Sequence, residues 1–350
     1  MHSIAVYPIA FLSTAALIHL LAPVARNIGL IDIPRGHKIH LGEVPLVGGI
    51  AMFCGFLFAI LAAPVSLAPL RPLFAASALL VIIGVLDDFR ELNPHSRFAA
   101  QIAAAAMMAL WGEVRLQDLG QLLGTEPALL GDWAIPFTVF AVVGVINAFN
   151  MLDGMDGLAG TYALVAFTLL GSAALFAAAT VSAVALFTLS AAVAAFLLAN
   201  LRLPGRPRAL VFMGNSGSLF LGLALAWFVV ALSQGEAPVI APVTALWILA
   251  IPLMDTVGIM LRRTLHRRSP LLPDREHLHH LLHALGFTVN GALAVILGTG
   301  TLLAAAGLCA HWLGVPERYQ FAAFLTLFTV YLAAMEVTWQ RLNGNAVAAD

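Results

Sequence analysis

The chain contains very little charge: Asp, Glu, Lys and Arg together make up 10% of its 350 residues. Soluble domains carry about a quarter charged residues, so this composition excludes an ordinary soluble protein. Hydrophobic residues make up 61% of the sequence, and the mean hydropathy is +0.96. These values predict an all-α integral membrane protein that crosses the bilayer many times.

The chain has only two cysteines and no recognisable N-terminal targeting sequence. Cys54 and Cys309 lie in apolar runs without metal-ligand spacing, which indicates packing residues. The N-terminus lacks a basic region and a cleavage site, so we interpret its first apolar segment as a retained helix. No soluble domain, low-complexity tail or repeat is visible, and we expect residues 1–350 to form a single membrane-embedded domain.

A helix needs about 20 mostly apolar residues to span a bilayer. The sequence predicts about eleven such helices. The uncharged run of residues 157–201 is too long for one helix, and we divide it near Ala178-Ala179-Thr180. The predicted spans are 4–24, 46–64, 70–86, 98–112, 134–151, 158–177, 181–200, 215–233, 239–261, 289–311 and 319–339.

Basic residues concentrate in the cytoplasmic loops of membrane proteins. Fourteen of the 17 Lys and Arg residues fall in loops after odd-numbered spans or in the C-terminal tail. Only Arg71, Arg115 and Arg318 fall on the opposite side. We therefore expect the N-terminus outside the cell and the C-terminus in the cytoplasm.

One polar segment, from Asn147 to Leu158, lies between long uncharged runs. Charge at the edge of a bilayer is costly and usually functional. Asp153 and Asp156, with Asn150 beside them, offer the hard oxygen ligands that Mg²⁺ prefers. A polar turn with the acids as helix caps is the alternative interpretation.

A pair of acids, Asp87 and Asp88, closes another apolar run. Adjacent residues on a helix point about 100° apart, so one structural bond does not explain both side chains. Acids at a helix C-terminus also oppose the helix dipole. This placement favours metal binding or base chemistry over solvation at the membrane surface.

Small residues from Gly214 to Ser218 begin a further predicted helix. Free N–H groups at such a helix start can accept a phosphate. A small-residue N-cap explains the same pattern.

The segment from Arg262 to His283 is rich in Arg and His. Arginines suit phosphate recognition, and histidines donate to phosphates or pair with carboxylates. Zinc binding by His277 and His280, or contact with anionic lipid headgroups, are the alternatives. Asp255 lies about two turns before the basic run, and we assign it a structural role only.

The only lysine of the chain, Lys38, lies close to His40 in the loop before the second span. A compact ammonium group beside a histidine fits a phosphate contact. Ordinary positive-inside bias is the alternative.

The predicted topology brings these polar segments to helix ends on the cytoplasmic side. A transporter would more often place such groups near the bilayer midplane. The pattern favours a site where a water-soluble anion meets a membrane-borne reactant.

Five motifs follow one another between Asp32 and His283. They are the Lys38–His40 segment before Pro45 and Gly48-Gly49, Leu86-Asp87-Asp88, Asn147-x-x-Asn150-x-x-Asp153-Gly154-x-Asp156-Gly157-Leu158, Gly214-x-x-Gly217-Ser218, and Pro273-Asp274-Arg275-x-His277-x-His279-His280. Together they resemble the polyprenyl-phosphate N-acetylhexosamine-1-phosphate transferases. The chain looks most like the bacterial WecA-type branch, which transfers GlcNAc-1-phosphate from UDP-GlcNAc to undecaprenyl phosphate. Eleven helices are also that family's topology.

The resemblance implies a reaction that depends on Mg²⁺, with Mn²⁺ as an alternative metal. A lipid phosphate oxygen attacks the β-phosphorus of the UDP-sugar, and UMP leaves, which initiates the synthesis of a cell-envelope polysaccharide such as lipopolysaccharide O-antigen. The implied location is the bacterial inner membrane, with the active site on the cytoplasmic face. The implied partners are a UDP-N-acetylhexosamine, undecaprenyl phosphate and membrane lipids, with no nucleic acid and with a homodimer left open.

The resemblance also implies roles for single residues. The catalytic carboxylates would be Asp87, Asp88, Asp153 and Asp156, and the sequence leaves open which is a base and which a metal ligand. The metal site would contain Asp87, Asp88, Asp153 and Asn215. The substrate contacts would be Lys38, His40, Asn147, Asn150, Arg275, His277, His279 and His280.

Three positions depart from the family pattern. His37 stands in place of the usual arginine, and Glu91 in place of an Asp or Asn. Asn215 stands where the resemblance implies a magnesium-binding aspartate. An amide oxygen can coordinate but brings no charge, so metal binding should weaken.

Two rival functions remain at the level of the sequence. The first is transfer of phospho-MurNAc-pentapeptide, but that branch carries three consecutive histidines after a proline. The form Asp274-Arg275-x-His277-x-His279-His280 favours the smaller UDP-HexNAc substrates. The second rival is a non-catalytic homologue that binds lipid phosphate, which only Asn215 supports.

Overall fold

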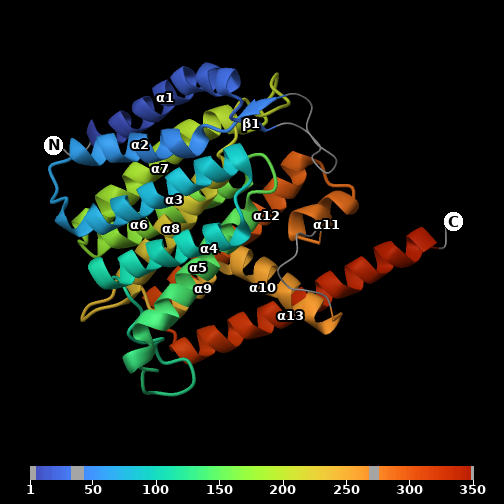
Figure 1. Cartoon of the computed structure of the whole chain (residues 1–350). Coiled ribbons are helices and arrows are strands. Elements are labelled where there is room, and N and C mark those ends of the chain that lie inside the picture. Colours follow the sequence, from blue (N-terminus) through green and yellow to red (C-terminus); the bar gives the residue numbers. More distant parts are fainter. Residues whose placement is uncertain (1–4, 33–42, 268–275, 348–350) are drawn as a thin grey trace. The chain divides into compact units, whose positions relative to one another are not determined.

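The computed structural model describes residues 5–32, 43–267 and 276–347, with side chains up to residue 342. Lys38, His40 and Arg275 lie outside these described residues. The expected all-α architecture is confirmed, with one minimal antiparallel sheet in which Ile31 pairs with Pro45. The elements are α1 (Val6–Ile28), β1 (Ile31–Asp32), β2 (Val44–Pro45), α2 (Gly48–Leu61), α3 (Arg71–Arg90), α4 (Pro94–Ala106), α5 (Ala134–Leu152), α6 (Leu158–Phe176), α7 (Thr180–Asn200), α8 (Gly214–Ser233), α9 (Pro242–Ile248), α10 (Ala250–Leu265), α11 (Leu278–Ala284), α12 (Val289–Trp312) and α13 (Glu317–Val347) (Figure 1).

The described helices include eight that are long and apolar enough to cross a membrane, or up to nine if the bent pair α9–α10 is one span. The chain is therefore a polytopic membrane protein. Two predicted spans correspond to shorter elements, because α2 has 14 residues and α4 has 13 before it continues as a π-helix, Met107–Trp111. The count of eleven spans and their orientation stay predictions.

Two breaks within long apolar runs show how the sequence divides its helices. The predicted division near Ala178 is confirmed, since α6 ends at Phe176 and α7 begins at Thr180. The span predicted over residues 239–261 is not one continuous helix: α9 and α10 are bent by 80° at their junction. Pro252 explains the bend, because it lacks the N–H that would bond to the carbonyl of Ile248 and its ring clashes with that turn.

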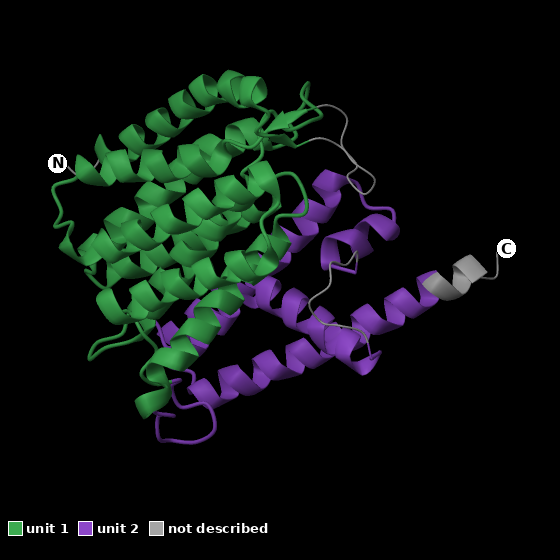
Figure 2. Cartoon of the chain, in the orientation of Figure 1, with its two compact units in different colours: residues 1–118, 130–239 green, residues 119–129, 240–350 purple. Residues whose placement is uncertain are grey.

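The chain groups into two compact units, which are described separately (Figure 2). Unit 1 comprises residues 1–118 and 130–239, and it contains α1 to α8. Unit 2 comprises residues 119–129 and 240–350, and it contains α9 to α13. The expectation of a single domain stays a prediction.

Helix α8 forms the centre of unit 1. Almost all of its residues from Ser216 onward are buried, and α3 and α5 pack along it. Glycines permit this close packing: a Cβ at Gly222 would lie 2.9 Å from the Cα of Ile146 on α5. Gly84 on α3 has the same effect, because a Cβ there would overlap the backbone of Ser216. The start of α8 therefore lies beside the last turns of α3.

Unit 2 has a small apolar core of its own. Ala250 and Met254 on α10 and Phe324 on α13 are buried together, with Trp247 and Tyr331 packed against them. The α10 and α13 helices are thus fixed against each other near the polar residues described below.

Candidate active site

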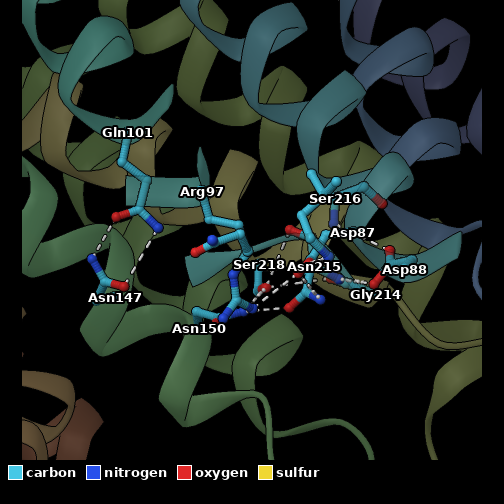
Figure 3. A network of polar contacts seen from close by, with 12 residues as sticks. Asp87, Asp88, Arg97, Gln101, Asn147, Asn150, Gly214, Asn215, Ser216 and Ser218 are labelled. Carbon is cyan, nitrogen blue, oxygen red and sulfur yellow. Dashed lines mark hydrogen bonds and ion pairs between the residues drawn. The ribbon is translucent and has the colours of Figure 1, made fainter. Parts of the chain in front are cut away.

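The first acid of the site, Asp88, meets the start of helix α8. Its Oδ1 accepts a hydrogen bond from the backbone N–H of Asn215 at 2.9 Å, and its Oδ2 accepts one from Ser216 at 3.4 Å (Figure 3). These N–H groups have no partner within the helix, and the helix dipole favours a negative charge at this end. Gly214 has a φ of +67° and lies so close to Asp88 that a Cβ there would overlap the carboxylate.

The neighbouring acid, Asp87, is 5% exposed and has a different set of partners. Its Oδ1 accepts from the N–H of Leu92 at 2.8 Å. Its Oδ2 accepts from Arg97 at 3.0 Å and from Nδ2 of Asn215 at 2.8 Å. The charge of Asp87 is therefore balanced within the protein by an arginine and two further donors.

Asn215 links the acids on α3 to the amides on α5. Its Nδ2 donates to Asp87, and its Oδ1 accepts from Nδ2 of Asn150 at 3.0 Å. Asn150 also donates to the hydroxyl of Ser218 at 2.7 Å. The reverse orientation of the Asn215 amide would place its oxygen against the carboxylate of Asp87, so this network fixes which end is the donor.

Asn147 does not join this network. It exchanges hydrogen bonds with Gln101 on α4, at 2.6 and 3.4 Å, and donates to the carbonyl of Val143 at 2.8 Å (Figure 3). The two asparagines of the motif thus have separate surroundings, although they lie one turn apart on α5.

Asp153 and Asp156 lie in the short connection between α5 and α6. Asp156 forms an ion pair with Arg202, with 2.7 Å between Oδ2 and Nε. Asp153 has no hydrogen-bond or ion-pair partner among the described residues. Burial, followed by the negative charges of Asp88 and Asp156, raises the pKa of Asp153 well above its usual range.

A buried asparagine holds this connection in place. Asn200, at the end of α7, accepts a hydrogen bond from the N–H of Gly157 at 2.8 Å and donates to the carbonyl of Val211 at 2.9 Å. It is 5% exposed. One side chain therefore ties the connection that carries the two acids to the segment that leads into α8.

The donor set of unit 1 fits a hard cation in part. Asp88 and Asp153 are close enough to repel each other, and no donor among the described residues balances the charge of Asp153. No three His, Cys, Asp or Glu side chains of the described part of the chain converge as a metal-binding group. Mg²⁺ does not require such a group, because it commonly uses one or two carboxylates together with waters and substrate phosphates.

The histidines of unit 2 surround a buried acid. Asp255 on α10 accepts from Nδ1 of His277 at 2.8 Å and from the N–H of Leu278 at 2.9 Å. The ring of His279 lies parallel to that of His277, with 5.9 Å between centroids, and is 4.1 Å from that of His280. Burial, followed by the nearby His280, lowers the pKa of His279 to about 3, so its ring is neutral at physiological pH.

One arginine of the predicted phosphate loop is already paired. Arg262 forms ion pairs with Glu276 and with Glu336 on α13, the second at 2.6 Å. It therefore connects the end of α10, the segment just before α11, and α13. This is a structural use of a side chain that the sequence assigned to phosphate recognition.

Comparisons with known proteins identify the family of this chain. The model of the glycosyl transferase family 4 matches residues 70–233. The chain is 38% identical to the undecaprenyl-phosphate alpha-N-acetylglucosaminyl 1-phosphate transferase of Escherichia coli (strain K12), over 94% of this chain and 90% of that protein. The enzymes of the same name from Yersinia pestis and Haemophilus influenzae are 40% and 38% identical, over 94% and 95% of this chain and 90% and 94% of their own lengths.

The chain belongs to glycosyl transferase family 4. The matched residues extend from the start of α3 to the end of α8. All of the unit 1 residues described above lie within them, whereas the histidines of unit 2 lie beyond. The resemblance drawn from the five motifs is thereby confirmed.

Several residues of the candidate site were not singled out from the sequence. Arg97, Gln101 and Arg202 are ordinary polar residues of helices or loops until their partners are known. Asn200 did leave a signal, since it is the only carboxamide in the uncharged run of residues 157–201. Asp255 was noticed, but its histidine partner was not.

Proposed function

We propose that this protein transfers GlcNAc-1-phosphate from UDP-GlcNAc to undecaprenyl phosphate and releases UMP. One observation carries the proposal: relatives with this activity in their names match the chain at 38–40% identity over at least nine-tenths of both lengths. The carboxylates and amides gathered in the family 4 part of the chain support it. Transfer of this sugar phosphate would begin the assembly of a cell-envelope polysaccharide.

In the proposed reaction, an oxygen of the lipid phosphate attacks the β-phosphorus of UDP-GlcNAc. The bond between this phosphorus and the oxygen of UMP breaks, and UMP leaves with the electron pair. The product is undecaprenyl diphosphate GlcNAc. Two anionic reactants must approach each other, so the protein has to hold them and offset their charge.

Asp88 and Asp153 are the proposed ligands of a divalent cation in unit 1, with Asn215 and Asp87 beside them. When bound, Mg²⁺ would neutralise the diphosphate and the departing UMP. Asp88 is fixed by the start of α8, and Asp87 by Arg97, so both acids keep their positions without a ligand. Either could act as the base that receives a proton from the lipid phosphate.

The substrate contacts are proposed on two groups of residues. Asn150 on α5, and Asp156 through its pair with Arg202, would shape the nucleotide side of the unit 1 site. His277, His279 and His280 would contact the phosphates of the UDP-sugar. The family motifs assign Asn147, Lys38, His40 and Arg275 to the substrates as well.

We further propose eleven membrane spans in the bacterial inner membrane, with the N-terminus outside and the site on the cytoplasmic face. The distribution of Lys and Arg supports this orientation. Within unit 1, the ends of α3, α5 and α7 and the start of α8 carry the polar network, so its residues share one end of the bundle. UDP-GlcNAc would reach them from the cytoplasm.

A comparison of two donors tests this function. Purified protein in undecaprenyl phosphate micelles is given labelled UDP-GlcNAc or labelled UDP-MurNAc-pentapeptide, and lipid-linked product is separated by chromatography. We expect product from the first donor only. Product from the second donor would favour peptidoglycan synthesis, and product from neither would favour a non-catalytic lipid-phosphate-binding protein.

A further inference from the structure

We propose that Asp255 is a positioning residue that holds His277 in a single tautomer for the transfer reaction. The reaction itself rests on the function proposed above, whereas the tautomer is a property of unit 2 alone. The family resemblance implies no role for Asp255 in the reaction.

The proposal starts from the contacts of one buried carboxylate. Asp255 is 4% exposed, and three donors converge on it. Its Oδ2 meets Nδ1 of His277 at 2.8 Å. Its Oδ1 accepts from the N–H of Leu278 and from the hydroxyl of Tyr331 on α13, both at 2.9 Å.

This arrangement determines which ring nitrogen of His277 carries the proton. An ionised carboxylate can only accept hydrogen bonds, so Nδ1 of His277 must donate to it. The bond made by one ring nitrogen sets the state of the other. The Nε2 atom of a neutral His277 is then left with a lone pair.

Contacts on both sides of His277 keep the ring in this position. Glu276 is paired with Arg262, which also holds Glu336. Leu278 is the first residue of α11, and its N–H is fixed on Asp255. The ring stacks on His279, and the His277 side chain is only 12% exposed.

The fixed tautomer has a consequence for phosphate chemistry. A neutral His277 can accept a proton only at Nε2. A protonated His277 can donate from Nε2 to a phosphate oxygen while Nδ1–H stays on Asp255. Asp255 thus acts through His277 and does not itself touch a substrate.

Two substitutions separate this role from simple packing. In Asp255→Asn, the amide oxygen can still accept from Leu278 and Tyr331, but the amide NH₂ now faces His277. The ring must accept at Nδ1, so the proton moves to Nε2. Tyr331→Phe removes one donor to Asp255 and leaves the carboxylate oxygen that faces His277 unchanged. Tyr319→Phe is the control, because it makes the same change at an exposed tyrosine of α13.

The tautomer is measured on the full chain in lipid nanodiscs with ¹⁵N-labelled histidine. Nitrogen chemical shifts distinguish protonated from unprotonated ring nitrogens, and His277→Gln identifies the signals of His277. We expect a protonated Nδ1 in the wild type, Tyr331→Phe and Tyr319→Phe, and a protonated Nε2 in Asp255→Asn. An unchanged tautomer in Asp255→Asn would overturn the proposal.

Transfer is measured on the same samples. We expect Asp255→Asn to lower turnover by about ten- to a hundredfold, as loss of a residue that orients a functional histidine does. Tyr331→Phe should lower it by no more than about fivefold, as for one neutral hydrogen bond. Equal losses in both variants, or normal turnover in Asp255→Asn, would contradict a positioning role. Absence of transfer by the wild type would refute the proposed function and leave the tautomer result intact.

Discussion

At the residue scale, Asp87 and Asp88 are adjacent in sequence and differ in their partners. Asp87 is held by an arginine and two other donors, whereas Asp88 accepts from the backbone N–H groups of Asn215 and Ser216. Asp153 has two acids for neighbours and no donor among the residues described. A bound cation would therefore stabilise the carboxylates of Asp88 and Asp153 more than that of Asp87.

We predict that Asp88→Asn or Asp153→Asn lowers turnover at least about a hundredfold, because each removes a charge at the reacting phosphates. Initial rates of the purified variants give the loss, and yield in the membrane fraction shows whether insertion is preserved. Near-normal turnover of either variant would refute the cation site.

We predict that Asn215→Asp lowers the Mg²⁺ concentration needed for half-maximal transfer. The new carboxylate replaces a donor to Asp87, so it adds repulsion that a cation relieves and a charge that attracts the cation. A titration of Mg²⁺ at saturating substrates measures the change. Asn290→Asp is the matched control, since Asn290 is an exposed residue of α12 that has no place in the proposed site.

The alternative for Asn215 is a role in bridging Asp87 and Asn150 alone. The side chain does not cap α8, whose N-cap is Met213 without a side-chain bond. With a bridging role alone, the Mg²⁺ requirement would be the same in Asn215→Asp and the wild type. A flat titration would contradict its assignment as a ligand.

We predict that His279 makes the protein less stable in acid. Its pKa in the folded state is about 3, and an unfolded histidine has a pKa of about 6.5. Between these values the unfolded state binds a proton that the folded state does not, so stability falls as the pH drops below about 6.5 and is unaffected above it. In thermal melting at several pH values, the melting temperature of His279→Gln should fall less on acidification than that of the wild type. The same loss in both would refute the prediction, and exposed His95→Gln is the control.

At the scale of elements, the site depends on how three segments meet. Helix α8 supplies free N–H groups to Asp88, and Gly84 and Gly214 allow α3 to approach its start. Asn200 then ties the α5–α6 connection to the segment before α8. The residues that hold the acids in place therefore come from elements that are far apart in the sequence.

We predict that Asn200→Ala lowers turnover by about tenfold or more, although Asn200 lies outside every predicted motif. The substitution frees the N–H of Gly157 and the carbonyl of Val211, so the connection that carries Asp153 loses its fixed position. Asn200→Asp keeps the acceptor for Gly157 and should retain more activity. Equal losses would show that the bond to Gly157 is not what matters.

Much of this arrangement was predictable from the sequence, for reasons that differ between residues. Apolar length predicted the helices, and the break near Ala178 followed from a run too long for one span. The bend at Pro252 was missed because apolar length alone does not show where a proline acts. Asp87, Asp88, Asp153 and Asp156 were chosen as candidates because charge next to apolar runs is costly. Partners such as Arg97 and Gln101 were not, because only the fold brings them to the site.

At the scale of the whole molecule, the scarcity of charge makes the candidate site residues easy to identify in the sequence. A chain with 10% charged residues places acids, amides and histidines at helix ends. Unit 1 carries the carboxylates and amides, and unit 2 carries the histidines and their buried acid.

The release of UMP by the purified full-length protein tests the central claim most directly. UMP is measured with UDP-GlcNAc in four mixtures: with and without undecaprenyl phosphate, and with and without Mg²⁺. We predict UMP only in the mixture that contains both, in amounts equal to the lipid-linked GlcNAc formed. UMP release without undecaprenyl phosphate, or release unaffected by the removal of Mg²⁺ with a chelator, would contradict the account.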